Sequence, residues 1–344
     1  MAYAETPYTE LDAGTDGSVG TNGKYVLFGE WPQTVMAEGV TINEEEVRQS
    51  GAFTYYLGSD GEWYVKQQEI PLEDFYKYSD GSEVRFSTNR ESFFRYFKVE
   101  PIKWRVLTTD YNGTGRKLLL AENILVSSRF YDSDRLRKTN GVKVYPSNYK
   151  ESAIRAFLNG LEYKVPRDFS VTGKEFIGKG FLQTAFTESI RDQITTTLVD
   201  NSKANTFSHG WPCICDDTAD KVFLLSYAEL RNIKYGFAEC EIDSRINSEQ
   251  DDEEVSEFVE SDNAKIRTIT DFAIAAGMQV DNCQRNCMGI PPAGRWLLRS
   301  PYDDEGRTVH DVSAIGGLVD EGYFNTAVVW NDYGVVPALC MDNK

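Results

Sequence analysis

The stretch that decides the fold reads PIKWRVLTTDYNGTGRKLLLA and runs from residue 101 to residue 121. Apolar and charged side chains alternate from Ile102 to Val106, which gives an extended strand one apolar face. Asn112-Gly113 tolerates the positive φ of a tight turn, and a second segment follows at 117–121 that is apolar from Leu118 onward. The stretch therefore predicts an antiparallel β-hairpin.

Further strands are expected upstream of this hairpin. Tyr25–Gly29 reads as the first strand of the domain, and Asp60-Gly61 and Asp80-Gly81 are turn signals within a polar segment at 40–100. We interpret residues 40–100 as a peripheral β insertion. Residues 1–24 are rich in Gly, Thr, Ser and Asp and predict a flexible N-terminal tether.

Short helices are expected downstream. Asn148 with Glu151 forms a possible capping box before an apolar face that ends at Gly160, Thr187 opens a second helix, and Ser226 with Glu229 caps a third. After about residue 295, short β segments alternate with glycine turns. The coarse prediction is an α+β fold in which β and irregular structure dominate.

Charge and hydropathy exclude several partners. The 344 residues carry a net charge of -18, so the chain repels phosphate backbones, and nucleic acid is excluded as a partner. No run of 18 apolar residues exists, so no transmembrane segment is predicted.

The sequence offers little local support for catalysis. Only two histidines occur, and His209 with Cys213 and Cys215 lacks the spacing of a structural zinc site. The acidic segment 249–262 reads as a solvated loop or helix, and the alternative of a calcium site lacks an EF-hand spacing. We therefore predict no metal site, no cofactor and no catalytic residues. The six cysteines permit disulfides, but buried free thiols are an equal alternative.

The C-terminal segment has the pattern of a binding surface. Apolar and glycine positions that look structural alternate with polar and aromatic residues expected on turns or on the outer strand face. Aromatic, Asn and Asp side chains are typical of adaptable binding surfaces, although an ordinary solvated edge has the same pattern. The predicted ligand-binding residues are Asp304, Glu305, Arg307, Thr308, His310, Asp311, Asp320, Tyr323, Phe324, Asn325, Trp330, Asn331 and Asp332.

Eight motifs in order resemble a known family. They read YVLFGEWPQT (25–34), PIKWRVL (101–107), LLLAE (118–122), SAIRAFLN (152–159), DKVFLLS (220–226), RTITDFA (267–273), WLLRSP (296–301) and GVVPAL (334–339). This series resembles the Treponema variable protein family of bacterial exported proteins, which are targets of a diversity-generating retroelement. The resemblance covers roughly residues 25–342.

The resemblance implies a C-type lectin fold of the formylglycine-generating-enzyme-like type, with residues 25–344 as a single domain. It also implies a variable ligand-binding region at about 296–339, on a lipoprotein anchored in the outer membrane at the cell surface. The expected partner is a protein or glycan on a host or neighbouring cell, and a monomer is expected. Met1 stands where the lipid-bearing cysteine is expected, so anchoring is an expectation for the native precursor.

Two other function classes remain open from the sequence. One is a sulfatase-modifying-type enzyme or hydrolase on the same fold, which predicts a deep pocket with paired thiols, such as Cys287 and Cys340, or paired carboxylates. The enzyme's cysteine pair is not matched in this sequence, so we predict a non-enzymatic binding protein. The other class is a structural or adhesive envelope component without a discrete ligand.

Overall fold

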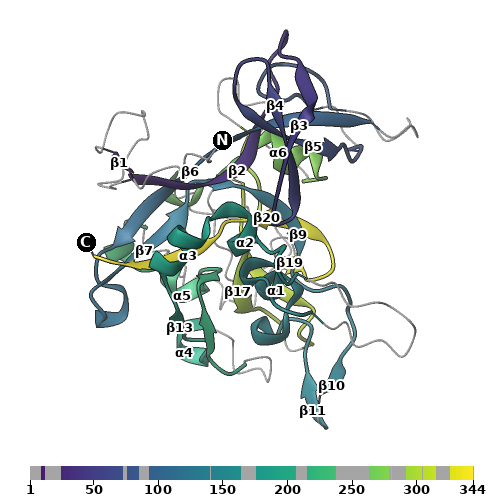
Figure 1. The fold of residues 1–344 in the computed structure, drawn as a ribbon. Coiled ribbons are helices and arrows are strands. Elements are labelled where there is room, and N and C mark those ends of the chain that lie inside the picture. Colours follow the sequence, from purple (N-terminus) through teal and green to yellow (C-terminus); the bar gives the residue numbers. More distant parts are fainter. Residues whose placement is uncertain are drawn as a thin grey trace, which may run out of the picture.

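The computed structural model describes residues 9–11, 25–72, 76–84, 93–139, 141–163, 176–206, 215–237, 263–278, 280, 292–303, 305–314 and 326–343. These ranges contain a ten-stranded sheet, a five-stranded sheet and three two-stranded pairs, with short helices between them (Figure 1). Strands outweigh helices, and the predicted α+β class is confirmed at this level.

The ten-stranded sheet is organised around its longest strand, β6. The strand β2 pairs along one side of β6, while β5 and β7 pair with the first and second halves of its other side. Beyond β5 the sheet continues through β4 to β3, and beyond β7 it continues through β21 to β12 and β15. The strands are β1 (Thr9–Leu11), β2 (Tyr25–Val35), β3 (Ile42–Ser50), β4 (Phe53–Gly58), β5 (Trp63–Gln68), β6 (Phe94–Thr108), β7 (Arg116–Ala121), β12 (Ile194–Thr195), β15 (Val222–Phe223) and β21 (Ala338–Asp342).

The hairpin predicted over residues 101–121 is confirmed. The strands β6 and β7 pair with Trp104 opposite Ala121, and their connection includes the 3-10 turn η1 (Tyr111–Gly113), where Asn112 has a φ of 52°. Arg105 was expected on a polar face, yet it is buried. Its guanidinium Nε donates to the Glu122 carboxylate at 2.9 Å, which compensates the buried charge.

Two predictions about the N-terminal third are refined. The turn at Asp60-Gly61 joins β4 to β5, and a β-bridge between Lys77 and Glu83 flanks Asp80-Gly81, so both hairpin signals are confirmed. The strands β3 to β5 continue the main sheet and end at its edge. Within the predicted tether, β1 pairs with β2, so residues 9–11 form a strand rather than a free linker.

The five-stranded sheet holds most of the described C-terminal segment. Its order is β19-β18-β17-β20-β9, and all neighbours are antiparallel except β17 and β20, which are parallel. Every residue of β17 is buried, so this strand is the core of the sheet. The strands are β9 (Val126–Arg129), β17 (Trp296–Pro301), β18 (Thr308–Val312), β19 (Thr326–Val328) and β20 (Asp332–Val335).

Short capped helices connect the two sheets. Thr187 caps α3 and Ser226 with Glu229 forms a capping box on α5, as predicted. Asn148 caps only the 3-10 turn η2 (Tyr149–Glu151), and Ser152 caps the following helix α1 instead. The helices are α1 (Ala153–Asn159), α2 (Phe181–Ala185), α3 (Glu188–Gln193), α4 (Lys203–Thr206), α5 (Tyr227–Leu230) and α6 (Asp271–Ala275). The short pairs are β8 (Asn123–Ile124) with β16 (Thr268–Ile269), β10 (Arg137–Thr139) with β11 (Val142–Val144), and β13 (Thr197–Val199) with β14 (Thr218–Asp220).

Three buried tryptophans tie these elements into one core. The indole nitrogens of Trp31, Trp104 and Trp296 donate to backbone carbonyls at 2.9–3.1 Å, so each ring is buried without an unsatisfied donor. In Figure 1 the helices α1 and α2 lie near the junction of the sheets, and α2 packs on β2 while α1 packs on β9 and β15. No helix within the described ranges is long and apolar enough to cross a membrane.

Candidate functional site

Exposed polar residues occupy turns and strand ends of the five-stranded sheet, and we call this set the C-terminal face. Six of the predicted ligand-binding residues lie there with at least partial exposure, and one further residue from β9 joins them. The C-terminal face consists of Arg129, Glu305, Arg307, Thr308, Trp330, Asn331 and Asp332.

Backbone hydrogen bonds bring these residues together. The Val329 amide donates to the Arg307 carbonyl at 3.0 Å, so the turn that carries Trp330 and Asn331 lies beside the β18 end. The Tyr131 amide donates to the Val329 carbonyl at 2.8 Å, which ties the same turn to the chain after β9. The positions of the face are therefore set by the backbone and not by the exposed side chains.

The exposed charges of the face form two ion pairs. Arg307 and Glu305 are 2.9 Å apart, and Arg129 and Asp332 are 3.4 Å apart, with all four side chains about half-exposed. Exposed pairs of this kind contribute about 0–1 kcal/mol to stability. Their side chains can exchange an internal partner for a ligand group at little cost.

Trp330 has a mixed environment. Its side chain is half-buried and packs against the hydrophobic core, while the neighbouring Asn331 is exposed. Half-buried tryptophans at the edge of polar surfaces are frequent binding anchors, because the ring is already held in one orientation. Trp330 is thus the described aromatic side chain of the face best suited to this role.

For two predicted site residues, the prediction of a position on the surface is wrong. His310 and Asp311 are each only 2% exposed, although both were expected on the outer face of the strand. The imidazole of His310 packs against the Tyr227 ring, with centroids 4.5 Å apart, and Asp311 accepts a 2.6 Å hydrogen bond from Arg295. The strand β18 lies between β17 and β19 and is covered on both sides, so its polar side chains do not mark a solvent face.

The buried Asp311 forms an ion pair with Arg295 within the five-stranded sheet region. Burial raises the pKa of Asp311 to about 6, in spite of the opposing effect of Arg295. The Arg295 guanidinium also lies 5.4 Å from the centre of the Tyr333 ring. These contacts join β18 to β20 across β17.

A fully buried ion pair anchors β17 to the rest of the molecule. The guanidinium of Arg299 donates to both carboxylate oxygens of Glu229 at 2.6 and 3.0 Å and to the Leu224 carbonyl at 2.7 Å. Glu229 also accepts from the Tyr111 hydroxyl at 2.6 Å and the Ser226 amide at 2.7 Å. Because Tyr111 adjoins β7 and Arg299 lies in β17, this cluster connects the two sheets.

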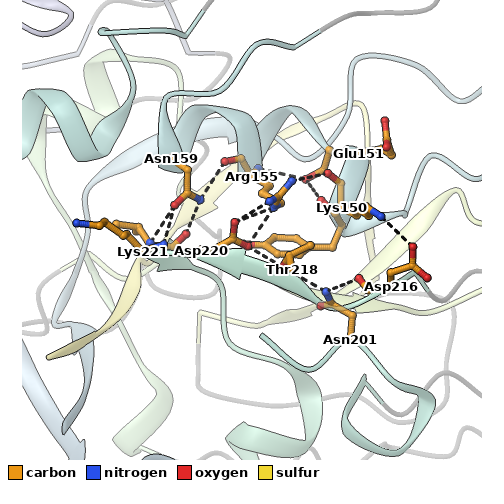
Figure 2. A network of polar contacts seen from close by, with 12 residues as sticks. Lys150, Glu151, Arg155, Asn159, Asn201, Asp216, Thr218, Asp220 and Lys221 are labelled. Carbon is orange, nitrogen blue, oxygen red and sulfur yellow. Dashed lines mark hydrogen bonds and ion pairs between the residues drawn. The ribbon is translucent and has the colours of Figure 1, made fainter. Parts of the chain in front are cut away.

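A second polar network positions α1 (Figure 2). Figure 2 shows Arg155 of α1 directed at the buried Asp220, and its Nε lies 2.9 and 3.0 Å from the two carboxylate oxygens. Asn159 bridges the same helix to β15 by accepting from the Lys221 and Val222 amides. All these groups bond to one another, which is the pattern of a structural network rather than of a reactive site.

The predicted residues Asp304, Asp320, Tyr323, Phe324 and Asn325 lie outside the described residues, as do His209, Cys213 and the acidic segment 249–262. Among the residues that the structure describes, no group of three or more His, Cys, Asp or Glu side chains could hold a metal ion.

The cysteines bear on the enzyme alternative. Cys340 is fully buried in β21, and burial raises the pKa of its thiol to about 12. Burial also raises the pKa of the Cys215 thiol. A reactive thiol needs a lowered pKa and access to solvent, and Cys340 has neither. Cys287, its suggested partner, lies outside the described residues.

Arg129 is the residue of the face that sequence reasoning missed. It lies about 200 positions before the rest of the face, and the antiparallel register of β9 and β20 places it opposite Asp332. No local pattern marks it, since the surrounding four-residue strand is short and half-exposed.

Comparison with known proteins gives a family but no characterised relative. Residues 114–343 match the family described as a domain of unknown function, DUF6273. No curated protein and no solved structure matches the chain. The matched region extends from the turn before β7 to β21 and includes the whole five-stranded sheet. Because it covers more than half of the sequence, the chain belongs to the DUF6273 family.

Proposed function

We propose that this protein is a surface-displayed, non-enzymatic ligand-binding protein whose C-terminal region selects a protein or glycan ligand. The observation that carries the proposal is the contrast within the five-stranded sheet. The core strand β17 is wholly buried and anchored by Arg299, whereas the C-terminal face, on turns and strand ends of the same sheet, is polar and exposed. A rigid scaffold with exchangeable surface side chains is suited to recognition.

The family resemblance supports the same proposal. The eight motifs fall on β2, β6, β7, α1, β15, α6, β17 and the β20–β21 segment, which together form much of the core. Taken together, motifs that form the core support the proposal that this chain shares its scaffold with the family it resembles. We therefore propose a C-type lectin fold of the formylglycine-generating-enzyme-like type, with a retroelement-diversified region at about 296–339 and display as an outer-membrane lipoprotein.

The environment of Cys340 supports binding over catalysis. A sulfatase-modifying-type mechanism needs an accessible pair of thiols, and this thiol lies inside the main sheet with a raised pKa. The enzyme alternative would need a different cysteine pair.

The test is a binding screen of the purified chain against host extracellular proteins and a glycan array. It compares the wild type with R129A/D332A and with R116A/D342A. The second variant is a matched control, because Arg116 and Asp342 form an exposed pair at the same 3.4 Å separation on the main sheet. We expect at least a tenfold loss of affinity in the first variant only, with unchanged thermal unfolding in both.

A further variant covers the aromatic part of the proposed region, with Tyr323, Phe324, Trp330 and Asn331 all changed to Ala. A ligand that binds this variant and R129A/D332A as tightly as the wild type would contradict the proposal, because its site would lie outside the C-terminal face.

A further inference from the structure

A second concave site lies on the main sheet, away from the C-terminal face. It is a pocket of about 260 Å³ between the bulged part of β2, the end of β3, Tyr55 of β4 and the segment that joins α2 to α3. The lining residues used below are Glu30, Arg48, Tyr55, Ala185, Phe186 and Ile190.

The pocket is shaped by close contact between the sheet and the helices. A register shift interrupts the pairing of β2 with β6 between Leu27 and Glu30, and Gly29 within it has a φ of +66°. A Cβ atom on Gly29 would lie 2.4 Å from the Phe186 ring, so only glycine permits this approach. Bulges commonly redirect a side chain near a functional site, and Glu30 follows this one.

Hydrogen bonds hold the opposite wall in place. The Thr184 hydroxyl donates to the Gly180 carbonyl at 2.7 Å and accepts from the Ala52 amide at 2.9 Å, which ties α2 to the turn between β3 and β4. Thr187, which also lines the pocket, caps the N-terminus of α3. The pocket is therefore formed before any ligand arrives, as is usual for small-molecule sites.

Two oppositely charged groups share the pocket. The Arg48 guanidinium lies 4.3 Å from the centre of the Tyr55 ring and 5.1 Å from that of Trp63. Stacking on aromatic rings fixes the plane of a guanidinium and suits it to bind a carboxylate through two parallel hydrogen bonds. Burial raises the pKa of Glu30 to about 7, while Arg48 lowers it and Glu62 raises it further.

The remaining wall is apolar. Phe186, Ala185 and Ile190 line it. At about 260 Å³ the pocket lies near the lower end of ligand-pocket volumes (roughly 300–1,000 Å³), so it suits a small molecule. A ligand that uses the whole pocket is small and carries a negative group, a positive group and an apolar part.

We propose that this pocket binds a free α-amino acid with an apolar side chain. Its carboxylate lies on Arg48, its ammonium group lies on Glu30, and its side chain contacts Phe186, Ala185 and Ile190. This site is independent of the C-terminal face and of the proposed function, because the two surfaces belong to different sheets.

The first experiment is calorimetric titration of the full chain with L-leucine, 4-methylpentanoate and 3-methylbutylamine. The second compound lacks the ammonium group and the third lacks the carboxylate. We expect saturable binding of L-leucine and at least tenfold weaker binding of each analogue. Equal affinity for L-leucine and 4-methylpentanoate, or no saturation by any apolar L-amino acid at 10 mM (roughly a 3 kcal/mol interaction), would overturn the proposal.

The second experiment separates the two charged groups. E30Q should lower the affinity for L-leucine at least tenfold but leave the affinity for 4-methylpentanoate unchanged. R48Q should lower the affinity for both ligands. R116A, on the other arm of the sheet, is the control with unchanged binding. Thermal unfolding of each variant shows that it is folded, and a folded E30Q variant with wild-type affinity for L-leucine would contradict the assignment of the ammonium site.

The third readout is the pH dependence of affinity. Among the described residues, the titratable groups that act on Glu30 are Arg48, Tyr55 and Glu62, and Arg48 and Tyr55 stay protonated near neutrality. As pH falls from 8 to 6, Glu30 takes up a proton and loses its attraction for the ammonium group. L-leucine should therefore bind several-fold more weakly at pH 6, and E30Q should remove this dependence. A wild-type affinity that is constant over this interval would refute the role of Glu30.

Discussion

Changing Glu229 to Gln is the sharpest test of how the two sheets are held together. Gln has the same shape as Glu but no charge, so the substitution leaves Arg299 as a buried cation without a counter-ion. Arg299 is fully buried, and its other described acceptors are the carbonyls of Leu224 and Asp200. Water cannot replace the lost carboxylate without opening the core.

The expected loss is large. Removal of one partner from a buried ion pair costs about 3–5 kcal/mol of unfolding free energy, because the other charge is left uncompensated. With an m value of about 3 kcal/mol/M in urea, the unfolding midpoint should fall by roughly 1–1.7 M. The double variant R299M/E229Q removes the orphaned charge and should recover part of this loss, since apolar replacements of buried pairs are often tolerated.

The assay is urea unfolding followed by tryptophan fluorescence at pH 7 and at pH 4. Burial alone would raise the pKa of Glu229, but Arg299, Tyr111 and Ser226 outweigh it and hold the pKa below 4.5. This group therefore stabilises the fold above about pH 4.5, and its contribution is lost as pH falls through the lower, folded-state pKa. A loss below 1 kcal/mol in E229Q at pH 7, or a double variant less stable than E229Q, would refute the reasoning.

Three further predictions concern single side chains. Burial raises the pKa of Asp311 to about 6, so the contribution of this group to the unfolding free energy declines as pH rises from about 4 to 6, by up to roughly 3 kcal/mol. In unfolding measured as a function of pH, D311N should flatten this slope. Cys340 should resist iodoacetamide at pH 8 in the native protein and react only in denaturant, as read by mass spectrometry, and rapid native labelling would show that the thiol is accessible. G306A should lower the unfolding free energy by about 3 kcal/mol against about 1 kcal/mol for G61A, because both glycines have positive φ but only at Gly306 would a new Cβ meet a neighbour, 2.6 Å from Tyr145; equal losses would remove steric contact as the cause.

Local signals in the sequence predicted local structure well. The hairpin over 101–121, the turn at Asp60-Gly61 and the capping box at Ser226 each depend on residues close together in the chain. The displaced helix start shows the limit of such signals. Asn148 and Ser152 are both good caps, and each does cap a turn, so composition alone could not select which one begins α1.

The candidate site was only partly predictable, because exposure depends on neighbours that are distant in sequence. Thr308 to Asp311 alternate little in polarity, and Tyr227 and Arg295 from other elements cover His310 and Asp311. Arg129 was missed for the same reason, since only the pairing of β9 with β20 brings it to the face. Strands covered on both sides lose the alternation that sequence reasoning relies on.

The place of β21 within the main sheet has a consequence for the order of folding. The ribosome makes residues 338–342 after every other described strand, yet β7 pairs with them on one side and β12 and β15 on the other. Without β21, β7 has an unpaired edge, and β12 and β15 lack the strand that joins them to the sheet. Closure of the main sheet therefore joins strands that are far apart in sequence, and such non-local pairing is slow, because loop-closure entropy is lost before the contacts form.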